Sequence, residues 1–282
     1  MFTIFGATGN TGSIVAQQLL AQGKPVRVVG RDPGKLAAFA GAEAVVGDVT
    51  DAATVAKALA GAEGAYLMLP PDNANPDLIA RNKLVTRNYL AGLKGVKHVA
   101  VLSSVGAERA SGTGPIVTAH DLEVALKEAG QQATVIRAAY FMENILQNAH
   151  PIRNDGVLPV LGGGEGYPFP MVATKDIGET AADALLHPGR DSYVELSSGP
   201  TDYSFDDAAQ LASEIVGRPV KTVVVPIEAV VPTLLQFGFS PSVAGLYREM
   251  VEAFASGLAF EGKGRRVRGH TTLADVLRAG LA

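Results

Sequence analysis

Short apolar runs alternate with stretches of helical periodicity through the first half of the chain. The runs are rich in β-branched residues and lie at 2–5, 25–29, 43–48, 65–69, 98–102 and 134–137. Between them, apolar side chains recur every three or four residues, as on one face of an amphipathic helix. Strands that alternate with helices predict a parallel, doubly wound α/β sheet, which we place at residues 1–150.

The pattern becomes irregular after Tyr140, and residues 155–170 are rich in glycine and proline. Further strands are expected at 193–196 and 223–225, with a helix at 205–216. Residues 151–282 are therefore expected to form mainly a smaller C-terminal α/β region, some of whose strands return to the first sheet. The aromatic side chains near the C-terminus are Phe237, Phe239, Tyr247, Phe254 and Phe260. Most of them are expected in the core, and some could line a ligand pocket.

One helix start in the second region is predicted from a local signal. The segment Asp176-Ile177-Gly178-Glu179 has the spacing of a capping box. In that motif an N-cap side chain and an acid three residues later satisfy each other's backbone amides. We therefore expect Asp176 to be an N-cap and Glu179 to be the third helical residue.

Three glycines at a spacing of three follow the first apolar run directly and precede the first helical pattern. Strand, glycine turn and helix together form the context in which such a fingerprint indicates a dinucleotide-binding Rossmann fold. A pyrophosphate needs close approach to backbone amides and to the positive end of a helix, and side chains at those positions would exclude it. The alternative is a glycine turn without a ligand. The expected cofactor-binding residues of this loop are Gly6, Thr8, Gly9, Asn10, Thr11 and Gly12.

The second apolar run ends in Gly30-Arg31, where NAD-binding enzymes carry a carboxylate that binds the ribose 2′-hydroxyl. A guanidinium can instead bind a 2′-phosphate through two parallel hydrogen bonds. Lys35, one helical turn further on, could add a second positive charge. The sequence therefore predicts NADPH in preference to NADH, the alternative being that Arg31 is merely solvated.

Other cofactor contacts are expected where further strands end, because the carboxyl ends of parallel strands face the ligand crevice. Asp48 could accept a hydrogen bond from the adenine amino group, or it could cap a local turn. Leu69 and Pro70 follow the fourth run and are expected to pass close to the cofactor. Ser103 and Ser104 end the fifth run, where they could touch a ligand or cap the strand.

Composition narrows the class of protein. The 282 residues carry a formal net charge of −4 and include no cysteine. We therefore expect no direct nucleic-acid partner, no disulfide and no zinc–thiolate site, and we predict no metal site. No apolar run approaches about 18 residues, so no membrane span is expected. The chain starts with strand-like sequence rather than a leader pattern, which favours a cytoplasmic location.

An ordered set of motifs resembles the NmrA-like family of atypical short-chain dehydrogenase/reductases. Besides the glycine loop, it comprises Gly30-Arg31-Asp32-Pro33, Arg137 with Phe141-Met142-Glu143-Asn144, Asp176-Ile177-Gly178, Gly217-Arg218-Pro219-Val220 and Gly269-His270-Thr271-Thr272-Leu273. The resemblance implies a Rossmann domain with a smaller C-terminal region and a ligand cleft between them. Members include NAD(P)H-dependent quinone reductases, isoflavone reductase-like enzymes and redox sensors that bind the dinucleotide without turning it over.

The chain departs from the usual catalytic pattern of these reductases. Their Tyr-x-x-x-Lys pair would correspond to Pro115 and Ala119, so the pair is absent. Ser103 and Ser104 lie where the reductases keep an active-site serine, and Ser104 is one catalytic candidate. His120 is the other, either as a proton donor or as a residue that points to solvent, and Glu123 could orient it.

Two hypotheses follow from these residues and the resemblance. The first is an NADPH-dependent reductase that acts on a quinone or a similar conjugated carbonyl compound, a substrate that needs little acid catalysis. The second is a non-catalytic NADP(H)-sensing regulator whose C-terminal region binds a protein partner. In either case the ligand is expected over Ser103 and Ser104, with substrate contacts from Phe141, Glu143 and Asn144.

Overall fold

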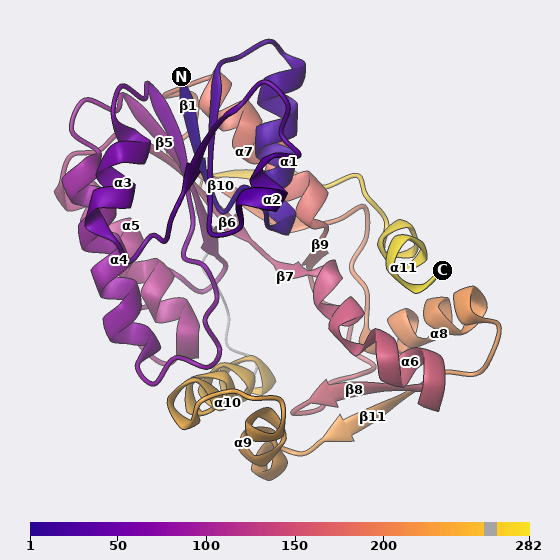
Figure 1. The fold of residues 1–282 in the computed structure, drawn as a ribbon. Helices are drawn as coiled ribbons and strands as arrows, with labels where there is room; N and C mark the ends of the chain where they lie inside the picture. Colours follow the sequence, from indigo (N-terminus) through magenta and orange to yellow (C-terminus); the bar gives the residue numbers. More distant parts are fainter. Residues whose placement is uncertain (257–263) are drawn as a thin grey trace.

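A computed structural model describes residues 1–256 and 264–282 and contains one large parallel sheet (Figure 1). Its strands are β1 (Phe2–Phe5), β2 (Val26–Gly30), β3 (Glu43–Val46), β4 (Gly64–Leu67), β5 (His98–Ser104), β6 (Ala133–Ala138), β10 (Tyr193–Ser198) and β12 (Arg265–Arg268). They lie in the order β12-β10-β6-β5-β4-β1-β2-β3, and every neighbouring pair is parallel. The predicted doubly wound α/β fold is thus confirmed.

Helices cover both faces of this sheet (Figure 1). They are α1 (Asn10–Ala21), α2 (Pro33–Leu36), α3 (Ala52–Leu59), α4 (Leu78–Gly92), α5 (Val117–Glu128) and α7 (Thr174–Leu186). One apolar layer joins α1 and α7 to the sheet, and a second joins α3, α4 and α5 to the opposite face. Among the described residues, no helix combines the length and the hydrophobicity needed to cross a bilayer.

Elements from beyond residue 150 take part in this central layer. Strands β10 and β12 extend the large sheet past β6. Helix α7 packs so closely on α1 that a Cβ on Gly178 would lie 2.5 Å from the Cβ of Ile14. Glycine at this position therefore allows the two helices to approach, and the C-terminal half of the chain completes the Rossmann core.

The remaining elements form the smaller C-terminal part. These are β7 (Tyr140–Phe141), η2 (Met142–Asn148), α6 (Ala149–Asp155), β8 (Val157–Leu161), β9 (Met171–Val172), α8 (Phe205–Val216), β11 (Lys221–Val225), α9 (Ile227–Gln236), α10 (Pro241–Ala255) and α11 (Leu273–Leu281). Strands β8 and β11 pair with each other, and so do β7 and β9, so the two pairs form two separate two-stranded sheets. Phe260 lies outside the described residues.

The start of α10 is attached to two loops of the Rossmann part. The Ser240 amide donates to the Asn73 carbonyl oxygen at 2.8 Å, and its hydroxyl donates to the Asn75 carbonyl oxygen at 2.5 Å. At the short helix η1 (Gly114–Ile116), the backbone of Gly114 touches that of Leu246, and a side chain on Gly114 would not fit. These contacts hold α10 against the loops that follow β4 and β5.

The predicted capping box at Asp176 is wrong. Helix α7 begins at Thr174, so Asp176 already lies inside its first turn. The helix start is satisfied instead by Glu143, whose carboxylate accepts hydrogen bonds from the Thr174 amide at 2.9 and 3.0 Å and from the Thr174 hydroxyl at 2.6 Å. Asp176 accepts hydrogen bonds from the amide and hydroxyl of Thr271, at 3.1 and 2.8 Å.

Candidate functional site

The glycine loop is folded so tightly that two of its glycines are needed by the loop itself. Gly6 has a φ of +65°, and a Cβ there would lie 3.0 Å from the sulfur of Met68. A Cβ on Gly12 would overlap the Gly6 carbonyl oxygen. The Gly9 amide donates to that same oxygen at 2.9 Å, which closes the turn. Gly9 itself is exposed at the N-cap of α1.

The start of α1 provides the features of an anion site. Among the described residues, the amides of Asn10, Thr11 and Gly12 have no hydrogen-bond acceptor. They lie in the first turn of a 12-residue helix, where the helix dipole favours negative charge. The loop that the sequence singled out thus presents free donors at the carboxyl end of β1.

Side chains of the loop differ in what they can do. The Thr11 hydroxyl is buried and accepts a hydrogen bond from the Tyr66 hydroxyl at 2.8 Å, so this side chain supports the loop from below. Asn10 is exposed, whereas Thr8 is half-buried and lies beside Gly30. The Thr11 side chain is therefore not free to contact a cofactor, whereas its backbone amide is.

Arg31 is well placed to meet an incoming anion, because it follows β2 directly and its side chain is 77% exposed. Its Nε lies 3.9 Å from Oδ2 of Asp48. Lys35 is also exposed, in the first turn of α2. Two cations with accessible side chains thus stand beside the second strand.

Asp48 binds its own local turn. Its Oδ1 accepts hydrogen bonds from the amide and the hydroxyl of Thr50, at 2.9 and 2.8 Å. Burial acts to raise the pKa of Asp48, but these hydrogen bonds and the charges of Arg81 and Arg31 outweigh it and lower the pKa below its ordinary value. The carboxylate therefore stays ionised, with its other oxygen toward Arg31.

The segment after β4 is fixed at the same edge. Leu69 and Pro70 are half-buried. Arg81 of α4 donates to the Pro70 carbonyl oxygen at 2.9 Å and pairs with Asp72 at 3.2 Å. Because Met68, just before Leu69, lies beside Gly6, this segment borders the glycine loop, and its contact with a cofactor stays a prediction.

The two serines at the end of β5 have different surroundings. The Ser103 hydroxyl is buried and donates to Oε1 of Glu123 at 2.5 Å. The Ser104 hydroxyl donates to the adjacent Val105 carbonyl oxygen at 2.8 Å and is half-buried. Ser103 is thus occupied inside the protein, and Ser104 is the serine that remains near the surface.

Ser103 belongs to a buried charged network that sequence reasoning missed. Arg137 of β6 binds Glu123 through two hydrogen bonds, Nε–Oε1 at 3.0 Å and Nη2–Oε2 at 2.7 Å. It also reaches Glu108 at 3.3 Å and lies 5.1 Å from the ring centre of Tyr193. Burial lowers the pKa of Arg137, but the carboxylates more than compensate, so it stays charged. A charged residue inside an apolar strand was the signal available in the sequence.

His120 does not pair with Glu123, which is occupied by Arg137 and Ser103. The His120 ring is half-buried, and its Nδ1 lies 2.8 Å from the Ala107 carbonyl oxygen. Since a carbonyl only accepts, Nδ1 carries the proton of this hydrogen bond.

The expected substrate residues have structural contacts. Phe141 is half-buried and packs against the layer that contains α1 and α7. Both oxygens of Glu143 are occupied at the start of α7. Asn144 accepts a hydrogen bond from Gln147 at 3.2 Å. Of the three, Asn144 is the polar side chain that a ligand could still reach.

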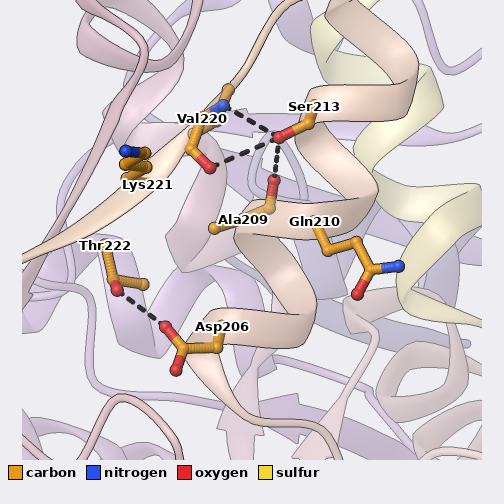
Figure 2. Close-up of a pocket in the computed structure, with 7 residues that line it drawn as sticks. All are labelled: Asp206, Ala209, Gln210, Ser213, Val220, Lys221 and Thr222. Carbon is orange, nitrogen blue, oxygen red and sulfur yellow. Dashed lines mark hydrogen bonds between the residues drawn. The ribbon is translucent and has the colours of Figure 1, made fainter.

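Two further features of the molecule are a surface pocket and a group of acidic side chains with a histidine. A shallow surface pocket between α8 and β11 is lined by residues such as Asp206, Ser213 and Thr222, whose polar side chains bind one another or the nearby backbone (Figure 2). Asp176, Glu179 and His270 bring possible metal-ligand atoms within 4.8 Å of one another. Asp176, however, is already bound by Thr271, so the group joins α7 to the C-terminal segment.

Three known proteins resemble this chain over most of its length. The NAD(P)H azoreductase of Xenophilus azovorans is 28% identical over 259 residues, which span 89% of this chain and 86% of the azoreductase. The triphenylmethane reductase of Citrobacter sp., solved with NADP(H), has a TM-score of 0.77 at 22% identity and covers 99% of this chain and 100% of its own. The NADPH-dependent quinone oxidoreductase of Escherichia coli, solved with NADPH, has a TM-score of 0.74 at 21% identity and covers 98% of both chains.

The two solved structures share the fold of this chain along its whole length. The model of the NmrA-like family matches residues 1–262, which include the glycine loop, Arg31 and Asp48. The chain belongs to the NmrA-like family.

Proposed function

We propose that the protein is an NADPH-dependent oxidoreductase that reduces a quinone or a similar conjugated carbonyl compound. The observation that carries this proposal is the pairing of free amides at the start of α1 with the exposed Arg31 at the end of β2. The amides suit a pyrophosphate, and the guanidinium suits a 2′-phosphate on the adjacent ribose. The reductase names of the azoreductase and quinone oxidoreductase relatives support the same activity.

The protein's part in this reaction is to bind and to orient. The bound cofactor would supply a hydride, and the quinone would take it up with one proton from solvent to give the hydroquinone. The glycine loop would hold the pyrophosphate, while Leu69, Pro70 and Ser104 would border the remainder of the dinucleotide. Holding the donor and acceptor rings in contact is sufficient for much of the rate, because proximity replaces a bimolecular encounter.

The absent Tyr-x-x-x-Lys pair is compatible with such a substrate. Pro115 and Ala119 offer no acid, and His120 directs its proton to the Ala107 carbonyl oxygen. A conjugated quinone accepts a hydride without prior protonation by the protein. We therefore assign proton delivery to water and give His120 and Ser104 no essential role in proton transfer.

A non-catalytic NADP(H)-sensing regulator is the second candidate. It is favoured by the absence of the Tyr-x-x-x-Lys pair and by the burial of Ser103 in the Arg137 network, which leaves Ser104 as the one of the two strand-end serines that lies near the surface. In this case the C-terminal part would contact a protein partner according to the redox state of the dinucleotide.

The two functions are separated by measuring NADPH binding and NADPH oxidation on the same protein. Absorbance of the reduced nicotinamide is followed over a panel of benzoquinones and naphthoquinones, and affinity is measured by calorimetry. Sustained turnover with at least one quinone supports the enzyme. Tight binding of NADPH without turnover across the panel contradicts it and supports the sensor.

A further inference from the structure

Two tyrosines near the carboxyl edge of the sheet carry hydroxyl groups that no other described residue binds. Tyr140 forms β7 with Phe141 and lies two residues beyond Ala138, the last residue of β6. Its half-buried ring stands edge-on to Phe169 and Phe205, with ring centres at 5.5 and 5.8 Å. The ring is thus fixed by neighbours that leave its hydroxyl without a partner.

Tyr247 approaches the same place from a different element. It lies on α10, and its half-buried ring stands edge-on to Phe239 with the ring centres 5.3 Å apart. The two phenols are close enough that an ionised Tyr247 adds to the rise in the pKa of Tyr140. Leu246, just before Tyr247, lies against Gly114 in the segment after β5, and Tyr140 follows β6, the neighbour of β5 in the sheet. Strand β7 and helix α10 therefore place the two tyrosines at adjacent strand ends.

The strand order indicates which half of a dinucleotide would lie near them. The order in which successive strands are added reverses at β1, with β2 and β3 on one side and β4, β5 and β6 on the other. If Arg31 at the end of β2 binds the adenosine half, the nicotinamide extends over the ends of β4 to β6. Tyr140 follows β6, so a hydride acceptor beside the nicotinamide comes within its reach.

We propose that the Tyr140 and Tyr247 hydroxyls donate hydrogen bonds to a carbonyl oxygen of a planar aromatic acceptor, a quinone above all. This inference rests on the reductase function proposed above and names the groups that recognise its substrate. The rings of Phe169 and Phe205, whose centres are 5.1 Å apart, border Tyr140 and provide apolar surface for a flat acceptor.

The surroundings keep both phenols in the form that donates. Burial raises the pKa of Tyr140 and of Tyr247 above the ordinary value for tyrosine, so neither ionises near neutral pH. Negative charge develops on the acceptor oxygen as the hydride arrives, and a hydrogen bond from a neutral phenol becomes stronger at that moment. The hydroxyls thus stabilise the oxygen while its proton comes from water.

The test removes each hydroxyl and keeps each ring. Tyr140→Phe and Tyr247→Phe are compared with Tyr167→Phe, a control that removes a tyrosine hydroxyl from a side chain that is 80% exposed. Calorimetry measures menadione binding to the NADP⁺-saturated protein, and steady-state kinetics give kcat/KM for menadione. Malachite green, an aromatic hydride acceptor without oxygen, is titrated in parallel.

Each of the two variants should weaken menadione binding by about 3- to 10-fold, as expected for one lost neutral hydrogen bond. Malachite green binding and the Tyr167→Phe control should change less than about twofold. Unchanged menadione affinity in both variants, or an equal loss for both ligands, overturns the proposal. So does a wild type that binds no menadione. Menadione that binds in a tyrosine-dependent way without turnover refutes the reductase function but supports this recognition.

Discussion

The carbonyl oxygen of Gly6 occupies the space that a side chain on Gly12 would need. Gly9 differs, because a Cβ there would lie 3.3 Å from the same oxygen and the residue is exposed. The three glycines of the fingerprint therefore have different tasks. Gly12 allows the loop to form, whereas Gly9 keeps the approach to the free amides open.

Gly9→Val should abolish NADPH binding and leave the fold largely intact, because a branched side chain would occupy the space of the pyrophosphate. Gly12→Val should lose both binding and stability, because the loop itself cannot close. Calorimetric titration with NADPH and thermal melting followed by circular dichroism separate the two effects. An unchanged NADPH affinity in Gly9→Val would refute the binding loop.

Arg31→Ala should remove most of the preference for NADPH over NADH. A charge-assisted hydrogen bond contributes about 1.5–3 kcal/mol, which corresponds to roughly 10- to 100-fold in affinity. NADH affinity should change little, since that cofactor lacks the 2′-phosphate. Arg87→Ala, which removes an exposed arginine on α4, is the matched control and should leave the preference unchanged. A wild type that prefers NADH would contradict this assignment.

Glu123→Leu should destabilise the protein strongly, because Arg137 would then keep a buried charge without its main partner. Removing one member of a buried ion pair costs about 3–5 kcal/mol in the free energy of unfolding. Urea denaturation measures this loss. Adding Arg137→Met to Glu123→Leu should recover part of it, since the uncompensated charge is gone. A single-variant loss below about 1 kcal/mol would show that the network contributes little.

His120→Ala should lower the rate of quinone reduction by less than about tenfold, whereas loss of a positioned general acid costs about 10²- to 10⁴-fold. The reason is geometric, because the ring proton is directed to the Ala107 carbonyl oxygen. Steady-state kinetics with saturating NADPH measure the effect. A drop of several hundredfold with unchanged NADPH affinity would make His120 the proton donor.

Local patterns in the sequence were sufficient for the first half of the fold. The alternation of apolar runs and helices predicted the strands from β1 to β6, and the glycine spacing located the free amides at the start of α1. The turn at Asp48 was one of two alternatives, because the sequence does not reveal whether a carboxylate binds its own backbone or a ligand. In the structure Oδ1 of Asp48 binds Thr50, and a contact of this carboxylate with adenine stays a prediction.

Contacts between distant residues were not predictable in this way. Asp176 and Glu179 have capping-box spacing, yet Glu143, 31 residues before Thr174, caps the helix instead. The Ser103 hydroxyl is similarly taken up by Glu123, which lies on the following helix and also holds Arg137. Such contacts form only when helices and strands pack together, so the spacing of residues along the chain does not predict them.

The most direct test of the central claim is steady-state oxidation of NADPH by a quinone, with product analysis. We expect many turnovers per protein, one hydroquinone formed for each NADPH consumed, slower reaction with NADH, and no activity in Gly9→Val. Wild-type protein that binds NADPH but oxidises no more than one equivalent, whatever quinone is supplied, would contradict the claim.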